Sequence, residues 1–443
     1  MNATRRLLAV SPALVFAAAT AWADGSAGAE TMDWAGAIRE AMAHNPSLIV
    51  ARDAVEAAKY GVTVASADFW PNLSTSASLN RSGNQALDDW SPVGPERDST
   101  SYSFGGSASW SLFSGWSTVA ARRRAKASLV QRQAGYRAAS QSLRWSLRQS
   151  FNRLLYAQRN LELLAAIRDR FDRHARFQEI QFKSGRDPRW TFLKAQADAA
   201  SVGWQITSAG FDRENARRQF ARLLGRDAEG ATALVASGDL VSATPLAELG
   251  PAYAEMERRH PEMQNQLAAV DASAASLTSS ESTRWPSLSA RAGYSWSDGK
   301  EWPPDSSGWW TGLSLSYPLF AGGGQEAAIR AARRSYEGSL ATLGDTRTSL
   351  RASLFQAWQA YSVGFARMPV LRLDAAASTE RYKTVEALYQ AGRAGYLDFE
   401  QAEGTITQAE QSLLSGRLIV AQAEADWVKA LGLTLEDEGG GAR

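Results

Sequence analysis

The chain has 443 residues, no cysteine and three histidines, and its formal net charge is only +2 at pH 7. The absence of cysteine excludes disulfides, zinc–thiolate sites and a lipid-bearing N-terminal cysteine. A charge near zero, with no basic patch interleaved with aromatic residues, argues against nucleic acid as a partner.

The first 23 residues (1–23) are typical of a secretory signal peptide. Arg5 and Arg6 precede the apolar run LLAVSPALVFAAAT, and Ala21-Trp22-Ala23 provides an A-x-A cleavage site. An uncleaved anchor is the alternative, but the run is short for a membrane span, which needs ~20 apolar residues. No later segment approaches that length. Export therefore leaves the periplasm, the medium or the outer membrane as destinations.

The sequence contains a tandem duplication. The segment FWPNLS recurs as RWPSLS, so that Trp70 and Trp285 are 215 positions apart, whereas later pairs such as Gly185 and Gly392 are 207 apart. The offset changes at GNQALDDWSPVGPERD, which is longer than its counterpart DGKEWPPDSSG. An insertion confined to one place is typical of a surface loop. We therefore expect two copies of one structural repeat.

Four segments alternate strictly between two kinds of residue. In WPSLSARAGYSWSDG (285–299), leucine, alanine, tyrosine and tryptophan share one parity, and serine dominates the other. WPNLSTSASLNRSG, STSYSFGGSASWSLF and WWTGLSLSYPLF show the same pattern. Such alternation predicts strands, here in two hairpins at 70–113 and 285–320. Aromatic residues on one face and serine on the other suit lipid on one side and water on the other.

Long helices follow each hairpin. No proline lies between Gly115 and Gly185, and large apolar residues recur at steps of three, four and seven, as in a coiled coil. A helix of ~65 residues is roughly 100 Å long, about three times the hydrocarbon thickness of a bilayer. Gly185 and Gly392 are expected to end these helices in the left-handed conformation. The run Gly322-Gly323-Gly324 favours a strand-to-helix turn over an anion-binding nest.

The predicted organisation has five parts. In chain order they are a signal peptide 1–23, a first repeat 24–225, a linker 226–250, a second repeat 251–432 and a tail 433–443. Each repeat opens with a helix ahead of its hairpin. The expected later helices are 116–184, 188–224, 324–391 and 396–431.

Four strands in one chain cannot form a closed membrane barrel. Known barrels start at ~8 strands, and the edges of an open sheet would leave backbone groups unpaired in lipid. We therefore expect several chains to share one barrel.

These features, in this order, resemble the TolC family of outer-membrane efflux and secretion channels over about residues 30 to 432. The matching features are the Asn-Pro and His-Pro helix starts at Pro46 and Pro261, the Trp-Pro-x-Leu-Ser segments, the turns LFSG and LFAGG, and the glycine tips in FKSG and YQAGRAGYLDFEQAE. The resemblance implies a mixed α and β membrane protein. In it, a long-helix coiled-coil α-barrel continues from a transmembrane β-barrel of about 12 strands that is shared between protomers.

The resemblance also implies partners. These are a homotrimer, outer-membrane lipid, a periplasmic adaptor (membrane fusion protein) and, through the adaptor, an inner-membrane pump or ABC exporter. The adaptor is expected to dock onto the helix tips, where small residues permit close backbone approach. The expected docking residues are Ser184, Gly185, Arg186, Ala391, Gly392 and Arg393.

A pore gate is implied at the same end of the helices. Asp398 lies where the family places a ring of inward-facing aspartates, although an ordinary exposed carboxylate is the alternative. The family's second aspartate is replaced here by Gln401, and Glu400 and Asp187 are the carboxylates that could compensate.

A second expectation at this end concerns Tyr389. It matches a family tyrosine that bonds an aspartate of the first repeat, whose position is occupied here by Thr191.

Enzymatic motifs are missing from the sequence. It holds no G-x-S-x-G, H-E-x-x-H or P-loop pattern, and His44, His174 and His260 are isolated. No catalytic, cofactor or metal site is expected, and a capping or exposed role is expected for His44 and His260.

The favoured function is therefore a passive exit channel of a tripartite efflux pump or type I secretion system, in the outer membrane and extending into the periplasm. The alternatives are a periplasmic coiled-coil adaptor or scaffold without a pore, and a secreted hydrolase. Lipid-patterned strands argue against the scaffold, which has no use for them, and the hydrolase lacks a site.

Overall fold

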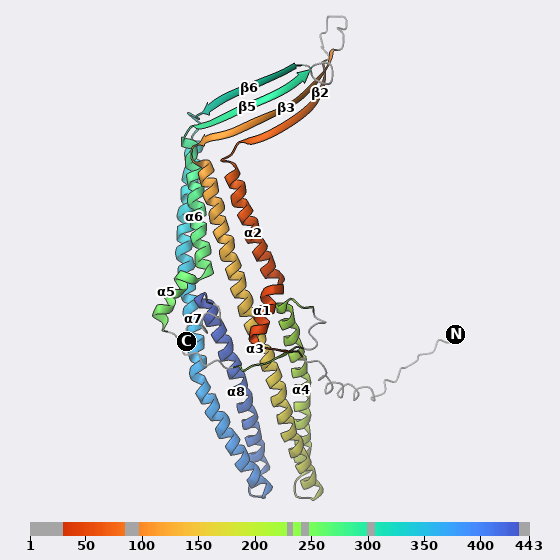
Figure 1. The fold of residues 1–443 in the computed structure, drawn as a ribbon. Helices are drawn as coiled ribbons and strands as arrows, with labels where there is room; N and C mark the ends of the chain where they lie inside the picture. The colour runs from red at the N-terminus through yellow and green to blue at the C-terminus, as the bar shows by residue number, and fades with distance from the viewer. Residues whose placement is uncertain (1–29, 85–96, 228–233, 241–247, 299–305, 434–443) are drawn as a thin grey trace, which may run out of the picture. The chain divides into compact units, whose positions relative to one another are not determined.

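The structure is a computed structural model that describes residues 30–84, 97–227, 234–240, 248–298 and 306–433 (Figure 1). The expected signal peptide (1–23) lies outside these ranges, as do parts of the linker and the tail from residue 434 onward.

The order of elements is the same in both halves of the chain. Each half has two short helices, two antiparallel strands, a helix of 67 residues and a helix of 36 residues. The first half comprises α1 (Trp34–His44), α2 (Pro46–Ala67), β2 (Asn72–Asn84), β3 (Arg97–Ser114), α3 (Ser117–Lys183) and α4 (Arg189–Leu224). The second comprises α5 (Leu249–Arg259), α6 (Pro261–Glu281), β5 (Ser287–Asp298), β6 (Ser306–Ser316), α7 (Gly324–Gln390) and α8 (Tyr396–Leu431). The equal helix lengths reflect the constant offset of the two repeats.

Three details differ from the sequence-based expectation, and the first is that two helices rather than one precede each hairpin. A short parallel pair, β1 (Glu30–Met32) with β4 (Leu234–Ala236), lies in segments for which no strand was predicted. The second hairpin also ends earlier than expected, because β6 stops at Ser316. Pro318 follows two residues later and has no N–H to donate to a strand ladder, so it cannot extend the strand.

The chain divides into two compact units. The sheet unit comprises residues 47–139 and 250–353, and the helical unit comprises residues up to 46, 140–249 and 354 onward. The helices α3 and α7 contribute their N-terminal parts to the sheet unit and their C-terminal parts to the helical unit.

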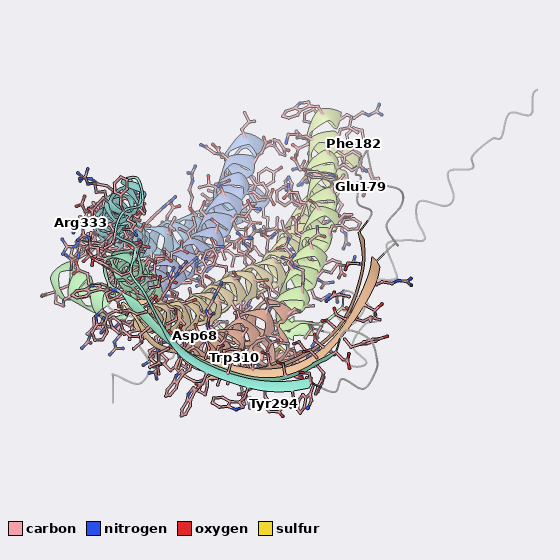
Figure 2. The ribbon with its side chains drawn as sticks, turned by 90° about the horizontal axis from the view of Figure 1, so that it is seen from above. Asp68, Glu179, Phe182, Tyr294, Trp310 and Arg333 are labelled. Carbon is pink, nitrogen blue, oxygen red and sulfur yellow. The ribbon has the colours of Figure 1, made fainter. Side chains whose placement is uncertain are left out.

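The sheet unit contains one four-stranded antiparallel sheet with the order β2-β3-β5-β6. Its register aligns residues of the same face in rows: Leu73, Ala108, Ala292 and Thr311 form one row, and Ser74, Ser107, Gly293 and Trp310 form the next. We call the two sides the apolar face and the serine face. The sheet curves, with Tyr294 on its convex side and Trp310 on its concave side (Figure 2). The predicted alternation is therefore confirmed.

No other described part of the chain covers the apolar face of the sheet. Leu73, Trp309 and Leu313 are each more than 70% exposed, and they lie on one face of one sheet. A contiguous apolar surface of this kind in a folded chain indicates contact with lipid or with another protein.

Equivalent turns join the sheet to the long helices. Gly115 and Trp116 have φ of 61° and 76°, and their counterparts Gly322 and Gly323 have φ of 59° and 79°. The glycine run is thus a strand-to-helix turn, as predicted. Trp116 adopts a left-handed backbone conformation, which is unfavourable for any residue with a Cβ atom. Its ring packs edge-on against Phe113 at a centroid distance of 6.1 Å.

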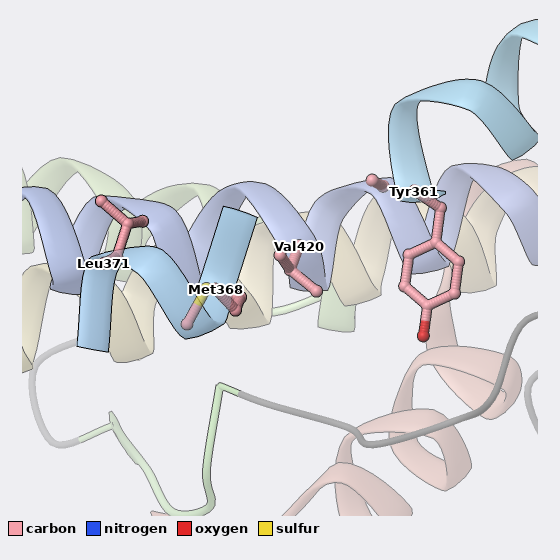
Figure 3. Close-up of a cluster of buried hydrophobic side chains, with 5 residues drawn as sticks. Tyr361, Met368, Leu371 and Val420 are labelled. Carbon is pink, nitrogen blue, oxygen red and sulfur yellow. The ribbon is translucent and has the colours of Figure 1, made fainter. Parts of the chain in front are cut away.

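The helical unit is held together by heptad-spaced contacts. Figure 3 shows Tyr361, Met368 and Leu371 of α7 packed with Val420 of α8. The buried residues of α7 continue this spacing of three and four: Tyr361, Gly364, Met368, Leu371, Ala375, Ser378 and Tyr382. Pro369 lies inside α7 without ending it. Within the described ranges, no helix combines the length and apolarity needed to cross a membrane.

The paired turns provide a matched test of backbone strain. A Cβ at Gly115 would lie 2.4 Å from the carbonyl oxygen of Ser282, whereas a Cβ at Gly322 would meet nothing within 4 Å. Gly322→Ala should therefore cost about 1 to 2 kcal/mol for the left-handed backbone alone. Gly115→Ala should cost more, because the turn must also move. Thermal unfolding of the purified protein checks this, and equal melting temperatures for the two variants would contradict it.

Candidate functional site

The two ends of the helical unit that were predicted as docking tips have the same geometry. Gly185 and Gly392 have φ of 72° and 71°, so each ends its long helix in the left-handed conformation. Main-chain bonds close both turns, from Arg186 N–H to Gln181 (3.0 Å) and from Arg393 N–H to Leu388 (2.8 Å). The six predicted docking residues are all exposed: Ser184, Gly185, Arg186, Ala391, Gly392 and Arg393. A Cβ on either glycine would meet open space.

Asp398 and Thr191 occupy equivalent places in the two repeats. Each is the third residue of its helix, α8 or α4. The Asp398 carboxylate accepts the N–H of Gly395 at 3.3 Å, and the Thr191 hydroxyl donates to the carbonyl of Pro188 at 2.7 Å. Asp398 is exposed and Thr191 is buried. A carboxylate in the first turn also suits the positive end of the helix dipole, so Asp398 has a structural role whether or not it faces a pore.

Tyr389 does not bond Thr191, the residue that stands at the position of the family's aspartate partner. Its hydroxyl donates to Asp187 Oδ2 at 3.4 Å and accepts a hydrogen bond from the side-chain amide of Gln178. Burial raises the pKa of Tyr389, and the neighbouring Asp187 acts in the same direction. The tie between the repeats therefore exists, but it uses Asp187 and a glutamine on α3. Thr191 is unsuited because its hydroxyl is already used inside its own helical turn.

The other predicted gate residues are engaged within the chain. Glu400 forms an ion pair with Lys194 at 3.0 Å, and Lys194 also binds Asp198 at 2.6 Å. Hydrogen bonds to Asp198 and Glu400 raise the pKa of Lys194 to about 12. Gln401 is exposed and accepts a hydrogen bond from Arg381 at 3.4 Å. Of the two compensating carboxylates, Glu400 is paired with Lys194 and Asp187 is bound to Tyr389.

Sequence reasoning missed the most buried carboxylate of this region. Glu403 is 3% exposed, and its Oε1 has no hydrogen-bond partner among the described residues. Burial raises its pKa to about 7; Arg170 opposes the shift, and the carboxylates of Asp198, Glu386 and Glu400 add to it. Helical spacing could have placed Glu403 on the packed face of α8, since Phe399 and Ile406 are buried there.

Arg170, the cation whose charge lowers the pKa of Glu403, already forms hydrogen bonds with other groups. Arg170 of α3 donates to both oxygens of Glu410 at 3.1 and 3.0 Å and to the hydroxyl of Thr407 at 3.2 Å. Arg170 therefore pairs with Glu410, and its charge also opposes the rise in the pKa of Glu403.

The histidines have structural surroundings. His174 is buried and stacks on Phe399 at 4.5 Å, and burial lowers its pKa to about 4. The ring of His260 accepts the N–H of Glu262 at the start of α6, as expected for a cap, and His44 lies within 3.2 Å of the Glu40 carbonyl at the end of α1. In the part of the chain that the structure describes, no three acidic, histidine or cysteine side chains are grouped to hold a metal.

The Glu403 environment predicts a pH dependence. Because its folded-state pKa is raised from the ordinary 4.5 to about 7, packing of α8 is favoured below about pH 4.5 and that contribution is lost as pH rises through about 7. Each unit of pKa difference is worth about tenfold in the opening equilibrium. Amide hydrogen exchange of residues 396–410, corrected for the intrinsic pH effect, should show less protection at high pH.

Two variants make this test specific. Glu403→Gln should remove the pH dependence, whereas Gln196→Glu places a carboxylate at the equivalent but exposed position of α4 and should leave it unchanged. The same pH dependence in Glu403→Gln would show that another group titrates.

Comparisons with known proteins place this geometry in a family. The family model described as outer membrane efflux protein matches residues 37–226 and 252–433. None of the curated proteins matches the chain.

Solved structures share the fold. VceC of Vibrio cholerae, an outer membrane protein, is 18% identical with a TM-score of 0.79, over 90% of this chain and 96% of that one. The CmeC outer membrane channel of Campylobacter jejuni is 16% identical with a TM-score of 0.79, over 90% and 85% of the two chains. The MtrE outer membrane channel of Neisseria gonorrhoeae is 20% identical with a TM-score of 0.75, over 91% and 89%. The family model covers both repeats and most of the sequence, and the protein therefore belongs to the outer membrane efflux protein family and resides in the outer membrane.

Proposed function

We propose that the protein is the exit channel of a tripartite efflux pump and conducts its cargo passively across the periplasm and the outer membrane. The observation that carries the proposal is a lipid-patterned sheet followed along the chain by the long helices α3 and α7, together with exposed apolar seams on α4 and α7. Both features require further copies of the chain. An assembly of this kind can conduct molecules through a channel, and conduction needs no catalytic site.

The sheet supports assembly first. In the four-stranded order, β2 and β6 are the edge strands, and their outer hydrogen-bonding groups have no strand partner among the described residues. In lipid such groups cost several kcal/mol each, so the edges must pair with strands of other copies. Three chains would supply about 12 strands, enough to close a β-barrel with the serine face inside.

The helices support the same assembly. On α4, one face packs inside the chain, and a second face carries exposed residues at strict heptad spacing: Trp190, Leu193, Ala197, Ala200, Trp204, Thr207 and Phe211. On α7, a second exposed seam runs through Val363, Ala366, Val370, Leu373 and Ala377. A helix with a seam on each side needs a neighbour on each side, as in a closed ring of helices. We infer that α4 of one copy packs on α7 of the next.

Partners follow from this arrangement. The exposed glycine tips at Gly185 and Gly392 are proposed to receive a periplasmic adaptor, which links the channel to an inner-membrane pump. An ABC exporter of a type I secretion system is the second candidate. Crosslinking of a purified adaptor to Ala391 tests the contact, and Gly392→Val should reduce it. Unchanged crosslinking in Gly392→Val would count against docking at the tip.

A pore-free periplasmic scaffold is the alternative function. It would explain the coiled-coil helices but leaves the uncovered apolar face of the sheet without a role. Solubility of the mature protein in the periplasm without detergent would favour it.

A charged substitution in the exposed seam on α4 should dissociate the oligomer into single chains. Trp204 is 71% exposed in the single chain. Trp204→Asp would place a charge in the contact and should yield single chains by native mass measurement in detergent. Ser201→Asp adds the same charge to an exposed position off the seam and should leave a trimer. Intact trimers of Trp204→Asp would refute the proposed packing.

Asp398 predicts the ion selectivity of the channel. If three copies line the closed end, they attract cations, so the channel should be cation-selective and blocked by divalent cations from the periplasmic side. Asp398→Asn should weaken both effects, and Asp398→Arg should shift selectivity toward anions. Glu400→Gln is the control, because Glu400 is already paired with Lys194. Planar-bilayer recordings in which both Asp398 variants keep the wild-type reversal potential would place Asp398 outside the pore.

A further inference from the structure

The serine face of the sheet is almost free of large side chains. Along the described strand segments 72–82, 101–114, 287–298 and 306–316, the positions on this face are serine, asparagine or glycine with two exceptions. The exceptions are Arg291 on β5 and Trp310 on β6. Trp310 lies on the concave side of the curved sheet (Figure 2). A wall made of small polar residues offers a passing molecule few contacts, so two large residues on it are conspicuous.

Glycines surround Trp310 on the serine face and leave room for its indole ring. Its cross-strand partner is Gly293, and its neighbours two residues away on the same face are Gly308 and Gly312. A Cβ at Gly293 would lie 2.6 to 2.7 Å from three atoms of the indole ring. The ring therefore lies against the main chain at a place that only glycine can provide. Trp310 remains 48% exposed, so much of its surface still faces outward from the sheet.

Arg291 is the neighbouring charge. It pairs with Gly312, two residues from Trp310 on the same face, which makes the two side chains diagonal neighbours within reach of one another. Arg291 is exposed, and it has no acidic partner among the described residues. The positions of this face in the same segments include no carboxylate. Its guanidinium is therefore free to bind an anion, and its planar fork suits a carboxylate or sulfonate.

We propose that Arg291 and Trp310 form a binding station for planar aromatic anions on the water-facing side of the sheet. The aromatic ring of the ligand stacks on the indole, and its carboxylate or sulfonate pairs with the guanidinium. The station rests on the proposed function, because the serine face is the wall of a pore only in the assembled channel. Cargo of this class would meet the same pair once in each copy.

A purely structural role accounts for only part of the arrangement. An aromatic ring that covers a cross-strand glycine stabilises the strand pair, and this would explain Trp310 over Gly293. It gives no role to an unpaired arginine beside the ring. The two explanations differ in what they predict for a ligand.

The experiment uses the purified, detergent-solubilised oligomer and naphthalene trisulfonate, a water-soluble aromatic anion, with binding followed by fluorescence anisotropy. Saturable binding is expected. Trp310→Leu should weaken it about three- to tenfold through loss of ring stacking, and Arg291→Gln should weaken it about tenfold through loss of a charged hydrogen bond. Trp309→Leu removes the adjacent tryptophan on the apolar face and should leave binding unchanged. Trp310→Phe keeps a ring and should restore most of the affinity if Trp310→Leu folds poorly.

Each outcome decides one question. Failure of the wild-type oligomer to bind the probe, or wild-type affinity in Trp310→Leu, would overturn the station. A loss in Arg291→Gln alone would reduce it to a plain anion contact and also overturn it. Binding does not require conduction, so an oligomer that binds the probe but passes no ions would contradict the proposed function and leave the station intact.

Discussion

A sheet with lipid on one side and water on the other cannot leave its edges unpaired. Each N–H and C=O of an edge strand that faces hydrocarbon costs several kcal/mol, and four strands are too few to curve back on themselves. In the proposed assembly, this constraint makes the single chain an incomplete structure. It explains why the strands alternate so strictly, since every position must suit one of two media. In the proposed assembly, the exposed seams on α4 and α7 call for other copies in the same way.

The two repeats share a scaffold but differ where local chemistry matters. Trp116 stands where the second repeat has Gly323, so one turn carries strain that its counterpart lacks. Thr191 and Asp398 occupy the same helical position, yet one is buried and neutral and the other exposed and charged. The buried Glu403 of the second repeat corresponds to Gln196 of the first repeat, which is exposed. Duplication therefore supplied the geometry, and later substitution made the ends of the helices unequal.

Sequence reasoning reached the features that depend on local patterning. Alternation predicted the strands and the faces they present, and glycines in left-handed turns predicted the helix ends at Gly185 and Gly392. The duplicated motifs indicated the family that the family model confirms. Sequence reasoning could not predict contacts between elements that lie far apart in the sequence. The bonds of Tyr389 to Gln178 and Asp187, and the burial of Glu403 beside Arg170, depend on how α3, α7 and α8 pack, which no local pattern specifies.

The seams on α4 and α7 are different surfaces, so the proposed contact between copies is heterologous, with each chain both a donor and an acceptor. A chain damaged on one seam would keep the other and could still join a growing ring without closing it. Such a mutant would be genetically dominant. If defective and normal copies are made in equal amounts and three are needed, about one ring in eight would be free of defective chains. A heterozygous or plasmid-borne α4 mutant would thus disable most of the channels in a cell that also makes the normal protein.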